Sequence, residues 1–251
     1  MSFKNIESNL MPPEIDNFAA GGNAKATARD YGMVAHLPID EVLARFTGAS
    51  LEISPGMRPF GGLEFGYSQS NIGDLIHYIG ASQGDPLPRT ARIGVGLNAG
   101  LTLSRRGHAW RIFSVAHLYE AEQLLVRVRQ PYKVTYEKFL GDIDFWDNVI
   151  LRKENPKIIT KSGWELSFFE TVSIRLGHYK DPLGKVDYDT RGFGVRLHGL
   201  LDAFLSDQPQ ESVIGFLIRH FDIQYDYGHY SAEKDHPLND TNFHGVGIRF
   251  F

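Results

Sequence analysis

The chain contains no cysteine, so disulfides, thiolate catalysis and cysteine-ligated metal centres are excluded. It also lacks any apolar run close to the ~18–20 residues that a transmembrane helix requires, and Val213–Ile218 is among its longest apolar stretches. An excess of positive charge is absent as well, because the formal net charge is −4 and no basic stripe is present. General nucleic-acid binding is therefore not expected.

The N-terminal part lacks the pattern of a secretory signal peptide. Met1–Ala20 contains Glu7, Glu14 and Asp16 and has no apolar core. We expect residues 1–25 to be an irregular segment and residues 26–251 to form one domain. For a protein of the bacterial envelope three explanations stay open: a leader removed from this numbering, an internal start, or a location outside the membrane.

What the chain does have is a two-residue hydrophobic period. From Ile93 to Leu103 the odd positions are apolar, and the even positions are glycine or polar. The chain ends on the same pattern, with Val246, Ile248 and Phe250 alternating with glycine and arginine. A helix would spread such residues around its circumference, so the period predicts strands with one apolar face.

Similar alternation predicts further strands along the chain. Trp110–Ala121 is ambiguous, because both of its faces mix apolar and polar residues. Together with the two strands above, the count is roughly ten, which predicts an all-β, antiparallel, up-and-down transmembrane β-barrel in a bacterial outer membrane. The barrel is either complete or, as the missing leader favours, an incomplete part of a larger barrel. A soluble sheet packed on its own core gives much the same pattern and stays open. The remaining predicted strands are Tyr31–Leu37, Ala49–Ile53, Leu63–Tyr67, Trp164–Phe168, Val172–Leu176, Phe193–Leu197 and Phe221–Tyr227.

Loop lengths support the barrel interpretation. If the C-terminus is periplasmic, the short turns share the periplasmic side and the long connections share the outer side, as barrels require. Only Leu200–Ser212 is long where a short turn is expected. The short turns are Ser54–Pro59, Ser104–Ala109 and Phe169–Thr171, and the long connections are Asn71–Thr90, Ala121–Ser162, Lys180–Thr190 and Gly228–Asp240.

The alternation assigns side chains to two faces. The polar residues predicted to face the lumen are Glu52, Glu64, Arg92, Glu165, Arg175, Arg196, His198, His220, Asp222, Asp226 and Arg249. The residues predicted to face lipid are Ile93, Val95, Leu97, Leu101, Phe193, Phe221, Ile223, Tyr225, Tyr227, Val246, Ile248 and Phe250. In the lumen, Arg92, Arg175 and Arg196 can pair with Glu64 and Glu165 and so plug the pore.

No constellation of residues supports catalysis. His220, Asp222 and Asp226 share one strand face, which fits a polar lumen better than a metal or base site. The carboxylates within 142–147 lack the glycine turn and closing glutamate of a calcium loop. The glycines of Gly94–Gly100 lie within a strand and lack the context of a phosphate loop. We therefore expect no enzyme, no cofactor and no metal.

Two successive motifs resemble a known family. The segment Phe60–Gly73 ends in an Asn-aliphatic-Gly turn, and Asp85–Leu97 carries a Pro-Leu-Pro run that leads into the alternating strand. Together they resemble the PorV/PorQ family of outer-membrane barrels, which is related to fatty-acid-transporter barrels. Gly163–Phe168 with Val172–Tyr179, and Phe221–Tyr227, are further matches, so the resemblance covers the chain from about Ala26 onward.

The resemblance implies a scaffold or shuttle in or near type IX protein secretion, in contact with outer-membrane lipid and with secretion-system proteins or cargo through the outer loops. Relatives usually have more strands and a Gly/Met-rich N-terminal segment, which this chain lacks. The alternatives are a transport barrel for small or hydrophobic solutes and a soluble β-sandwich binding module.

Overall fold

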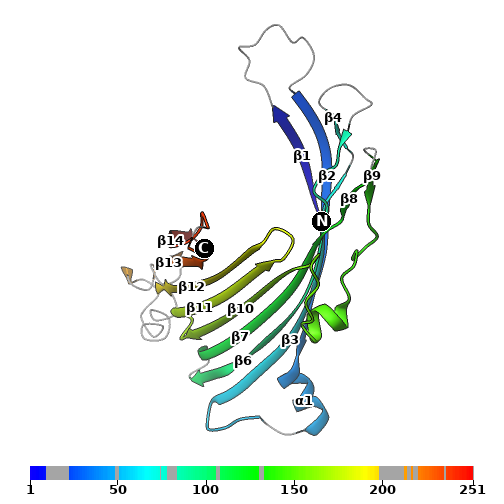
Figure 1. Ribbon diagram of the computed structural model, residues 1–251. Coiled ribbons are helices and arrows are strands. Elements are labelled where there is room, and N and C mark those ends of the chain that lie inside the picture. Colours follow the sequence, from blue (N-terminus) through cyan, green and yellow to red (C-terminus); the bar gives the residue numbers. More distant parts are fainter. Residues whose placement is uncertain are drawn as a thin grey trace. The chain divides into compact units, whose positions relative to one another are not determined.

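A computed structural model describes most of the chain, and β-strands dominate it (Figure 1). The described residues are 1–9, 23–48, 51–73, 75–77, 84–105, 108–129, 133–197, 212–213, 216, 220–234 and 236–250. Within these ranges, no helix has the length and apolar character needed to cross a membrane. The elements are β1 (Ser2–Asn9), β2 (Asn23–Pro38), α1 (Ile39–Thr47), β3 (Met57–Gly73), β4 (Ile76–His77), β5 (Gly84–Asp85), β6 (Thr90–Arg105), β7 (His108–Leu124), β8 (Val126–Arg129), β9 (Lys133–Tyr136), a π-helix at Phe145–Ile150, β10 (Ile159–Phe168), β11 (Val172–Asp181), β12 (Val186–Arg196), β13 (Phe221–Ala232) and β14 (Thr241–Phe250).

Ten strands form one antiparallel sheet in the order β1-β2-β3-β6-β7-β10-β11-β12-β13-β14. Two small two-stranded sheets are formed by segments that lie between strands of the large sheet in the chain. One consists of β4 and β5, and the other of β8 and β9. The predicted all-β, antiparallel class with ten strands in chain order is therefore confirmed. A closed ring of strands is not detected within the described ranges.

The chain divides into two compact units, which we describe separately. The first comprises Met1–Ala35, Phe65–Gly94 and Glu120–Ile159, and the second comprises His36–Glu64, Val95–Tyr119 and Thr160–Phe251. All of the buried hydrophobic side chains found among the described residues belong to the first unit. The described hydrophobic core therefore lies in the first unit.

The N-terminal hairpin belongs to the first unit and corrects two predictions. Strand β1 pairs with Asn23–Asp30 of β2, and an ion pair of 2.6 Å joins Lys4 and Asp30. Ile6 packs against alanines of β2 and against Leu87. The irregular segment predicted over residues 1–25 is therefore wrong for Ser2–Asn9, and Tyr31 does not begin the first strand. Residues 10–22 lie outside the described part.

The connection between β7 and β10 is part of the first unit and packs on β3 through aromatic rings. Phe139 stacks on Tyr67 with ring centroids 4.6 Å apart, and Phe145 contacts Phe65 edge-on at 5.7 Å. Asp142 receives a hydrogen bond from Lys157 at 2.7 Å, and this bond lowers the pKa of the carboxyl group. Apolar contacts and ion pairs together order this long loop.

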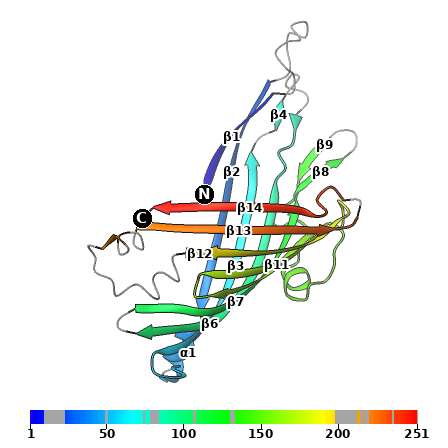
Figure 2. The same cartoon turned by 90° about the vertical axis from the view of Figure 1, so that its left-hand side faces the viewer.

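Strands β10 to β14 of the second unit form a regular meander, visible from two sides in Figures 1 and 2. Glu165 pairs with Arg175, Arg175 with Gly192, and Gly192 with Gly228. The β13–β14 ladder continues from Phe221 opposite Phe250. Because side chains alternate along every strand, these registers place each residue of the meander on one of two faces.

Near the start of the second unit one predicted strand is wrong and one helix was not predicted. A helix, α1, precedes the strand predicted at Ala49–Ile53, and Leu51–Ile53 are not in a strand. The helix forms because apolar residues recur every three to four positions over Ile39–Phe46. It ends at Gly48, whose left-handed backbone suits glycine. Residues 49–50 lie outside the described part.

The loop-length prediction is only partly borne out. The turn at Phe169–Thr171 is short, as predicted, and part of the predicted turn at Ser104–Ala109 lies outside the described residues. The connection predicted over Lys180–Thr190 is instead a tight turn at 182–185, because β11 and β12 extend further than their apolar residues. The β2–β3 connection is long because it contains α1, and most of Leu200–Ser212 lies outside the described residues.

Candidate functional site

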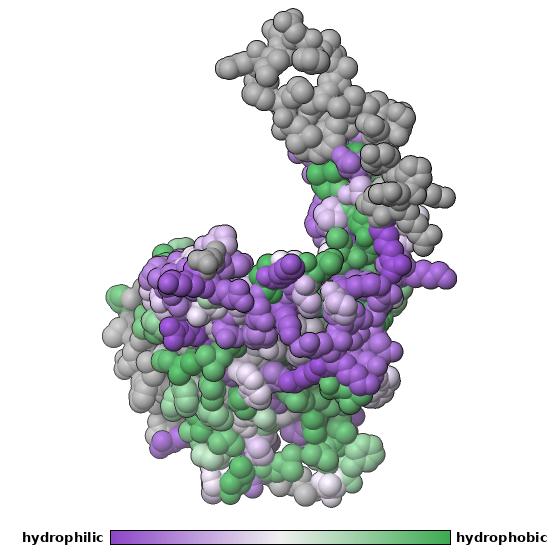
Figure 3. Space-filling view, in the orientation of Figure 1, coloured by the Kyte–Doolittle hydropathy of each residue, from purple (hydrophilic) through white to green (hydrophobic). Residues whose placement is uncertain are grey.

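One face of the meander carries an exposed apolar band. Its side chains alternate with the polar side chains of the other face, and Leu176, Val246 and Phe250 are more than half exposed. Figure 3 shows hydrophobic residues gathered over the strands of the second unit. The apolar band consists of Trp164, Leu166, Phe168, Val172, Ile174, Leu176, Phe193, Val195, Phe221, Ile223, Tyr225, Tyr227, Val246, Ile248 and Phe250.

Beyond the band, the same face becomes polar on every strand. His178 pairs with Asp189 across β11 and β12, with a hydrogen bond of 2.8 Å. On β13 and β14, His229 lies opposite Asn242 and contacts its amide oxygen at 2.9 Å. The band therefore ends along a line across five strands rather than at scattered positions.

That line is oblique to the strands. The last apolar residues before the polar part are Trp164, Leu176, Phe193, Tyr227 and Val246 on β10 to β14 respectively. Trp164 lies directly opposite Leu176, but Phe193 lies opposite Ile174, two residues nearer the other end of β11. Val246 lies opposite Tyr225, which precedes Tyr227 by two residues on β13, so the displacement has the same direction. The edge of the band thus drifts by four residues across the meander.

The opposite face carries a chain of hydrogen bonds and ion pairs that we call the polar ladder. Arg175 donates to Glu165 at 2.6 Å and to Asp226 at 2.8 Å. Gln224 donates to Asp226 at 2.6 Å and accepts from Arg196 at 2.9 Å. Arg196 also lies 3.4 Å from Asp222. The ladder, Glu165, Arg175, Asp226, Gln224, Arg196 and Asp222, links β10 to β13 with charges of alternating sign.

A glycine makes the longest step of the ladder possible. Arg175 on β11 reaches Asp226 on β13 by crossing over β12 at Gly194. A Cβ atom at Gly194 would lie 2.6 Å from Asp226 Oδ1 and 2.7 Å from Ser173 Oγ. These distances are too short for real Cβ contacts, so a larger residue would displace the Arg175–Asp226 contact.

Asp222 is the most deeply placed member of the polar ladder. It is 4% exposed, and its Oδ1 atom has no hydrogen-bond partner within the described structure. Arg249 lies directly opposite it on β14. A buried carboxylate held against a single guanidinium favours a fixed, paired arrangement over an open charged surface.

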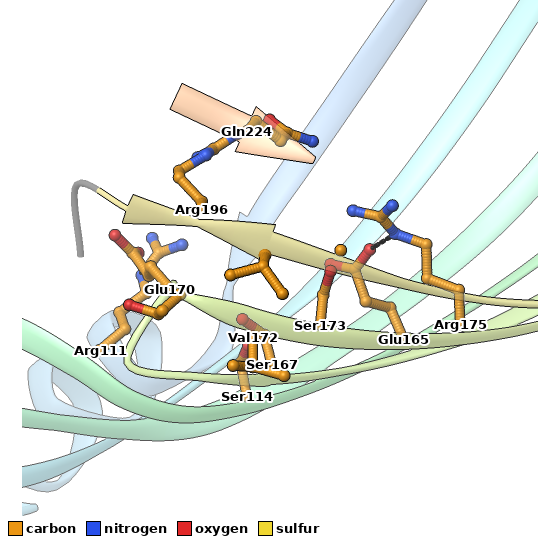
Figure 4. A pocket seen from close by; sticks show the side chains of 13 residues that line it. Arg111, Ser114, Glu165, Ser167, Glu170, Val172, Ser173, Arg175, Arg196 and Gln224 are labelled. Carbon is orange, nitrogen blue, oxygen red and sulfur yellow. Dashed lines mark hydrogen bonds and ion pairs between the residues drawn. The ribbon is translucent and has the colours of Figure 1, made fainter. Parts of the chain in front are cut away.

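A polar pocket of about 240 Å³ adjoins the polar ladder (Figure 4). Its walls carry the hydroxyls of Ser114, Ser167 and Ser173, and the Arg111–Glu170 ion pair of 3.7 Å lies at one end. Arg196 and Gln224 lie on the strands beside it. The pocket therefore offers neutral hydroxyl groups together with charged side chains that are already ion-paired.

The structure brings together some of the predicted lumen residues. Glu165, Arg175, Arg196, Asp222 and Asp226 all belong to the polar ladder, and the predicted Arg175–Glu165 pair is present. Arg196 pairs with Asp222 rather than with a glutamate.

Other lumen candidates lie elsewhere. Arg92 pairs with Glu122 at 2.9 Å in the first unit, not with Glu64 or Glu165. Glu64 instead accepts a hydrogen bond from Asn98. Glu52 is not in a strand and accepts from the Gly56 amide.

The proposed row of His220, Asp222 and Asp226 is incomplete. His220 precedes β13, and its ring contacts Phe216 at 4.5 Å, so it does not continue the row. His198 lies outside the described residues.

The predicted lipid-facing residues of β12 to β14 all lie in the apolar band; these are Phe193, Phe221, Ile223, Tyr225, Tyr227, Val246, Ile248 and Phe250. On β6, Val95, Leu97 and Leu101 share one face by alternation, and Leu97 is half exposed. Ile93 is buried within the first unit, so its predicted lipid exposure is wrong. Contact of the others with lipid stays a prediction.

The acidic loop has structural partners. Asp142 pairs with Lys157, Asp147 pairs with Lys153 at 2.9 Å, and Asp144 accepts from the backbone of Asp147. Among the described residues, no group of three or more His, Asp or Glu side chains is placed to hold a metal ion.

The sequence interpretation missed two contributors to the polar ladder. Gln224 lies between Asp222 and Asp226 in the same alternating row, so the two-residue period contained the signal for it. Gly194 lies on the polar face by alternation and was not singled out. Its role depends on a contact between β11 and β13, which the sequence of one strand does not reveal.

Comparison with known proteins adds no assignment. No family model matches the sequence, and a search of curated proteins finds no match.

Proposed function

We propose that the protein is a β-barrel of a bacterial outer membrane whose apolar band contacts lipid and whose polar ladder faces the barrel interior. The observation that carries this proposal is the oblique edge of the exposed apolar band. A soluble sandwich requires a second sheet over its apolar face, whereas eleven of the fifteen band side chains are exposed and none of them is buried.

The geometry of the edge supports a membrane boundary. A drift of four residues corresponds to about 13 Å along the strands, and the distance from β10 to β14 is about 19 Å at about 4.8 Å per strand. A straight boundary with this drift crosses the strands at about 35° from their perpendicular. Strands of outer-membrane barrels tilt by ~35–45°, so a flat lipid surface explains the observed line.

The band width is also compatible with a thin bilayer. On β12 only Phe193 and Val195 belong to the band, and each of the other four strands presents three or four apolar side chains on this face, such as Trp164, Leu166 and Phe168 on β10. At about 6.7 Å per residue pair, that corresponds to about 20–27 Å along the strand and about 16–22 Å along the membrane normal. The apolar zone of such barrels is ~25 Å tall, and the bacterial outer membrane is thinner than average.

Within the membrane, the function that we propose is a scaffold or shuttle in protein secretion at the cell surface. Its support is the resemblance of Phe60–Gly73 and Asp85–Leu97 to the PorV/PorQ family, together with the paired polar ladder. In the ladder, both Arg175 and Arg196 are engaged by carboxylates, which suits a closed interior more than a conducting one. The ordered loop that packs on Tyr67 and Phe65 is a candidate partner surface.

The test of membrane contact uses Trp164 as the reporter. Replacing Trp110 and Trp146 by Phe leaves Trp164 as the single tryptophan. In vesicles of phospholipid with brominated acyl chains we expect strong quenching of its fluorescence, together with heat-modifiable gel mobility. A matched variant that retains only Trp146, in the outer loop, reports the environment outside the band. Unquenched Trp164 in a protein that folds fully in plain buffer would rule out the membrane assignment.

A transport barrel is the second candidate, because the 240 Å³ polar pocket has room for a small solute. The two functions differ in permeability. For a scaffold we expect no flux of small sugars or amino acids into vesicles that contain the protein. Flux that is altered by Ser167→Val, a substitution in the pocket wall, would favour transport instead.

A further inference from the structure

Helix α1 has an apolar face that is only partly covered, since Ile39 and Val42 are half-buried and Leu43 and Phe46 are exposed. Ile39, Val42, Leu43 and Phe46 follow the spacing of one helical stripe, and none of them is buried. Leu43 is 47% exposed and Phe46 is 85% exposed. The helix is well formed, since the Gly48 amide bonds to the Ala44 carbonyl at 3.0 Å. An ordered amphipathic helix therefore presents its apolar stripe outward.

Local contacts fix this helix at one end of the strands of its unit. The carboxylate of Asp40 accepts a hydrogen bond from the amide of Gly61, near the start of β3. The amide of Ser104, near the end of β6, bonds to the carbonyl of Gly56 in the same connection. In the antiparallel order this is the end at which the β10–β11 turn also lies. The apolar stripe thus lies where strands of the second unit end.

Exposed apolar and basic groups flank the stripe. Leu37, the last apolar residue of β2, is half exposed, and Ile53 after the helix is also exposed. Arg45, Arg58 and Arg105 are exposed at this end, and no ion pair is found for them among the described residues. Apolar side chains bordered by arginines match the boundary between acyl chains and phosphate headgroups.

We propose that α1 lies flat in the lipid–water interface, with its stripe among the acyl chains and the three arginines against lipid phosphates. The occupant of the apolar face is a phospholipid surface. This inference rests on the proposed membrane location of the apolar band and adds a second, monotopic contact with the same bilayer. The helix would hold the β2–β3 connection at a fixed depth.

Fluorescence quenching tests the position of the helix. In a chain without its native tryptophans, Phe46→Trp places a reporter on the stripe, and Leu43→Trp provides a second one. Leu183→Trp is the matched control, because Leu183 is equally apolar and 76% exposed but lies in the β11–β12 turn. We expect bromines near the headgroup end of the acyl chains to quench the reporter of Phe46→Trp at least twofold more than bromines near the bilayer centre do. Neither set of bromines should quench the reporter of Leu183→Trp.

The outcomes separate this inference from the proposed function. Quenching at positions 46 and 43 together with quenching of Trp164 supports both. Quenched Trp164 with unquenched reporters on α1 overturns the interfacial helix and leaves the barrel standing. Unquenched reporters at both places overturn both proposals. Concentration-dependent association that Phe46→Glu abolishes, without quenching at position 46, would assign the stripe to a second copy of the chain and overturn the lipid contact.

Discussion

The Arg175–Asp226 contact over Gly194 gives the sharpest test of the polar ladder. In Gly194→Ala the new Cβ atom would lie 2.6 Å from Asp226 Oδ1 and 3.4 Å from Arg175 Nη1. One of the two side chains must move, and the ion pair across β12 opens. The matched control is Gly247→Ala on the same face, where the nearest atom to the new Cβ is Gln224 Cβ at 4.0 Å.

Two effects set the expected magnitude. The side chains of Arg175 and Asp226 are 44% and 36% exposed, so loss of their ion pair is worth only ~0.2–1 kcal/mol. Crowding of a packed site costs about 1–3 kcal/mol, and the lower end applies because Asp226 Oδ1 and Ser173 Oγ can rotate away. We expect Gly194→Ala to lower the free energy of unfolding by about 1–2 kcal/mol more than Gly247→Ala does. Both substitutions reduce the entropy of the unfolded chain equally, so this contribution cancels.

The assay is urea unfolding of the protein folded in lipid bilayers, followed by tryptophan fluorescence and by heat-modifiable mobility. A double-mutant cycle with Asp226→Ala isolates the mechanism, because it removes both the partner of Arg175 and the nearest clashing oxygen. In that background Gly194→Ala should have less than half of its original effect. Equal effects of Gly194→Ala in the two backgrounds, or equality with Gly247→Ala, would refute the crossing contact.

Three further predictions concern the apolar band, the chain end and the outer loop. Leu97→Arg should impair membrane insertion, by ~2–4 kcal/mol if Leu97 lies near the bilayer midplane. The control Leu183→Arg, in the β11–β12 turn, should insert normally. Equal insertion yields of the two variants would contradict the lipid-facing assignment of Leu97. Phe250→Asp removes a ring packed edge-on against Phe221 at 4.8 Å and should severely reduce the amount of protein assembled in the membrane. Deletion of Phe251 should be tolerated. The membrane level of each variant measures both effects. Because the hydrogen bond from Lys157 lowers the pKa of Asp142, the stabilisation from this pair is present above the ordinary value of 3.8 and is lost as pH falls through the lower folded-state value. Hydrogen exchange of residues 138–157 should therefore rise only below about pH 4, whereas Asp142→Asn should raise it already at neutral pH.

The alternation of side chains explains how much of the fold could be predicted from the sequence. Strands such as β6 and β13 follow directly from a two-residue period, because a strand with one apolar face has no other pattern. Strand β1 was missed because its sequence, Ser2–Asn9, carries a single well-packed apolar residue, Ile6, and its pairing with β2 depends on backbone hydrogen bonds. Helix α1 was missed because the helix is only nine residues long, and over so short a segment four apolar residues indicate a helical period only weakly.

For the candidate site, the sequence could predict which face a residue lies on but not which residue it pairs with. Membership of the polar face could be predicted from alternation, which is why Glu165, Arg175 and Asp226 were all identified. The pairing of Arg92 with Glu122 and of Arg196 with Asp222 depends on register, which single strands do not specify. Burial also escapes alternation, since Ile93 has the pattern of a lipid-facing residue but is covered by its own unit.

The separation of buried hydrophobic residues into the first unit has a consequence for biogenesis. The fully buried side chains of Leu87, Leu125, Val149 and Ile158 all lie in that unit. The described part of the second unit has no buried hydrophobic side chain, and in water its exposed apolar band would favour aggregation. If the proposed membrane location holds, a newly made chain must be kept from aggregating until it reaches the membrane, and contact of the band with lipid would drive the last step of its folding.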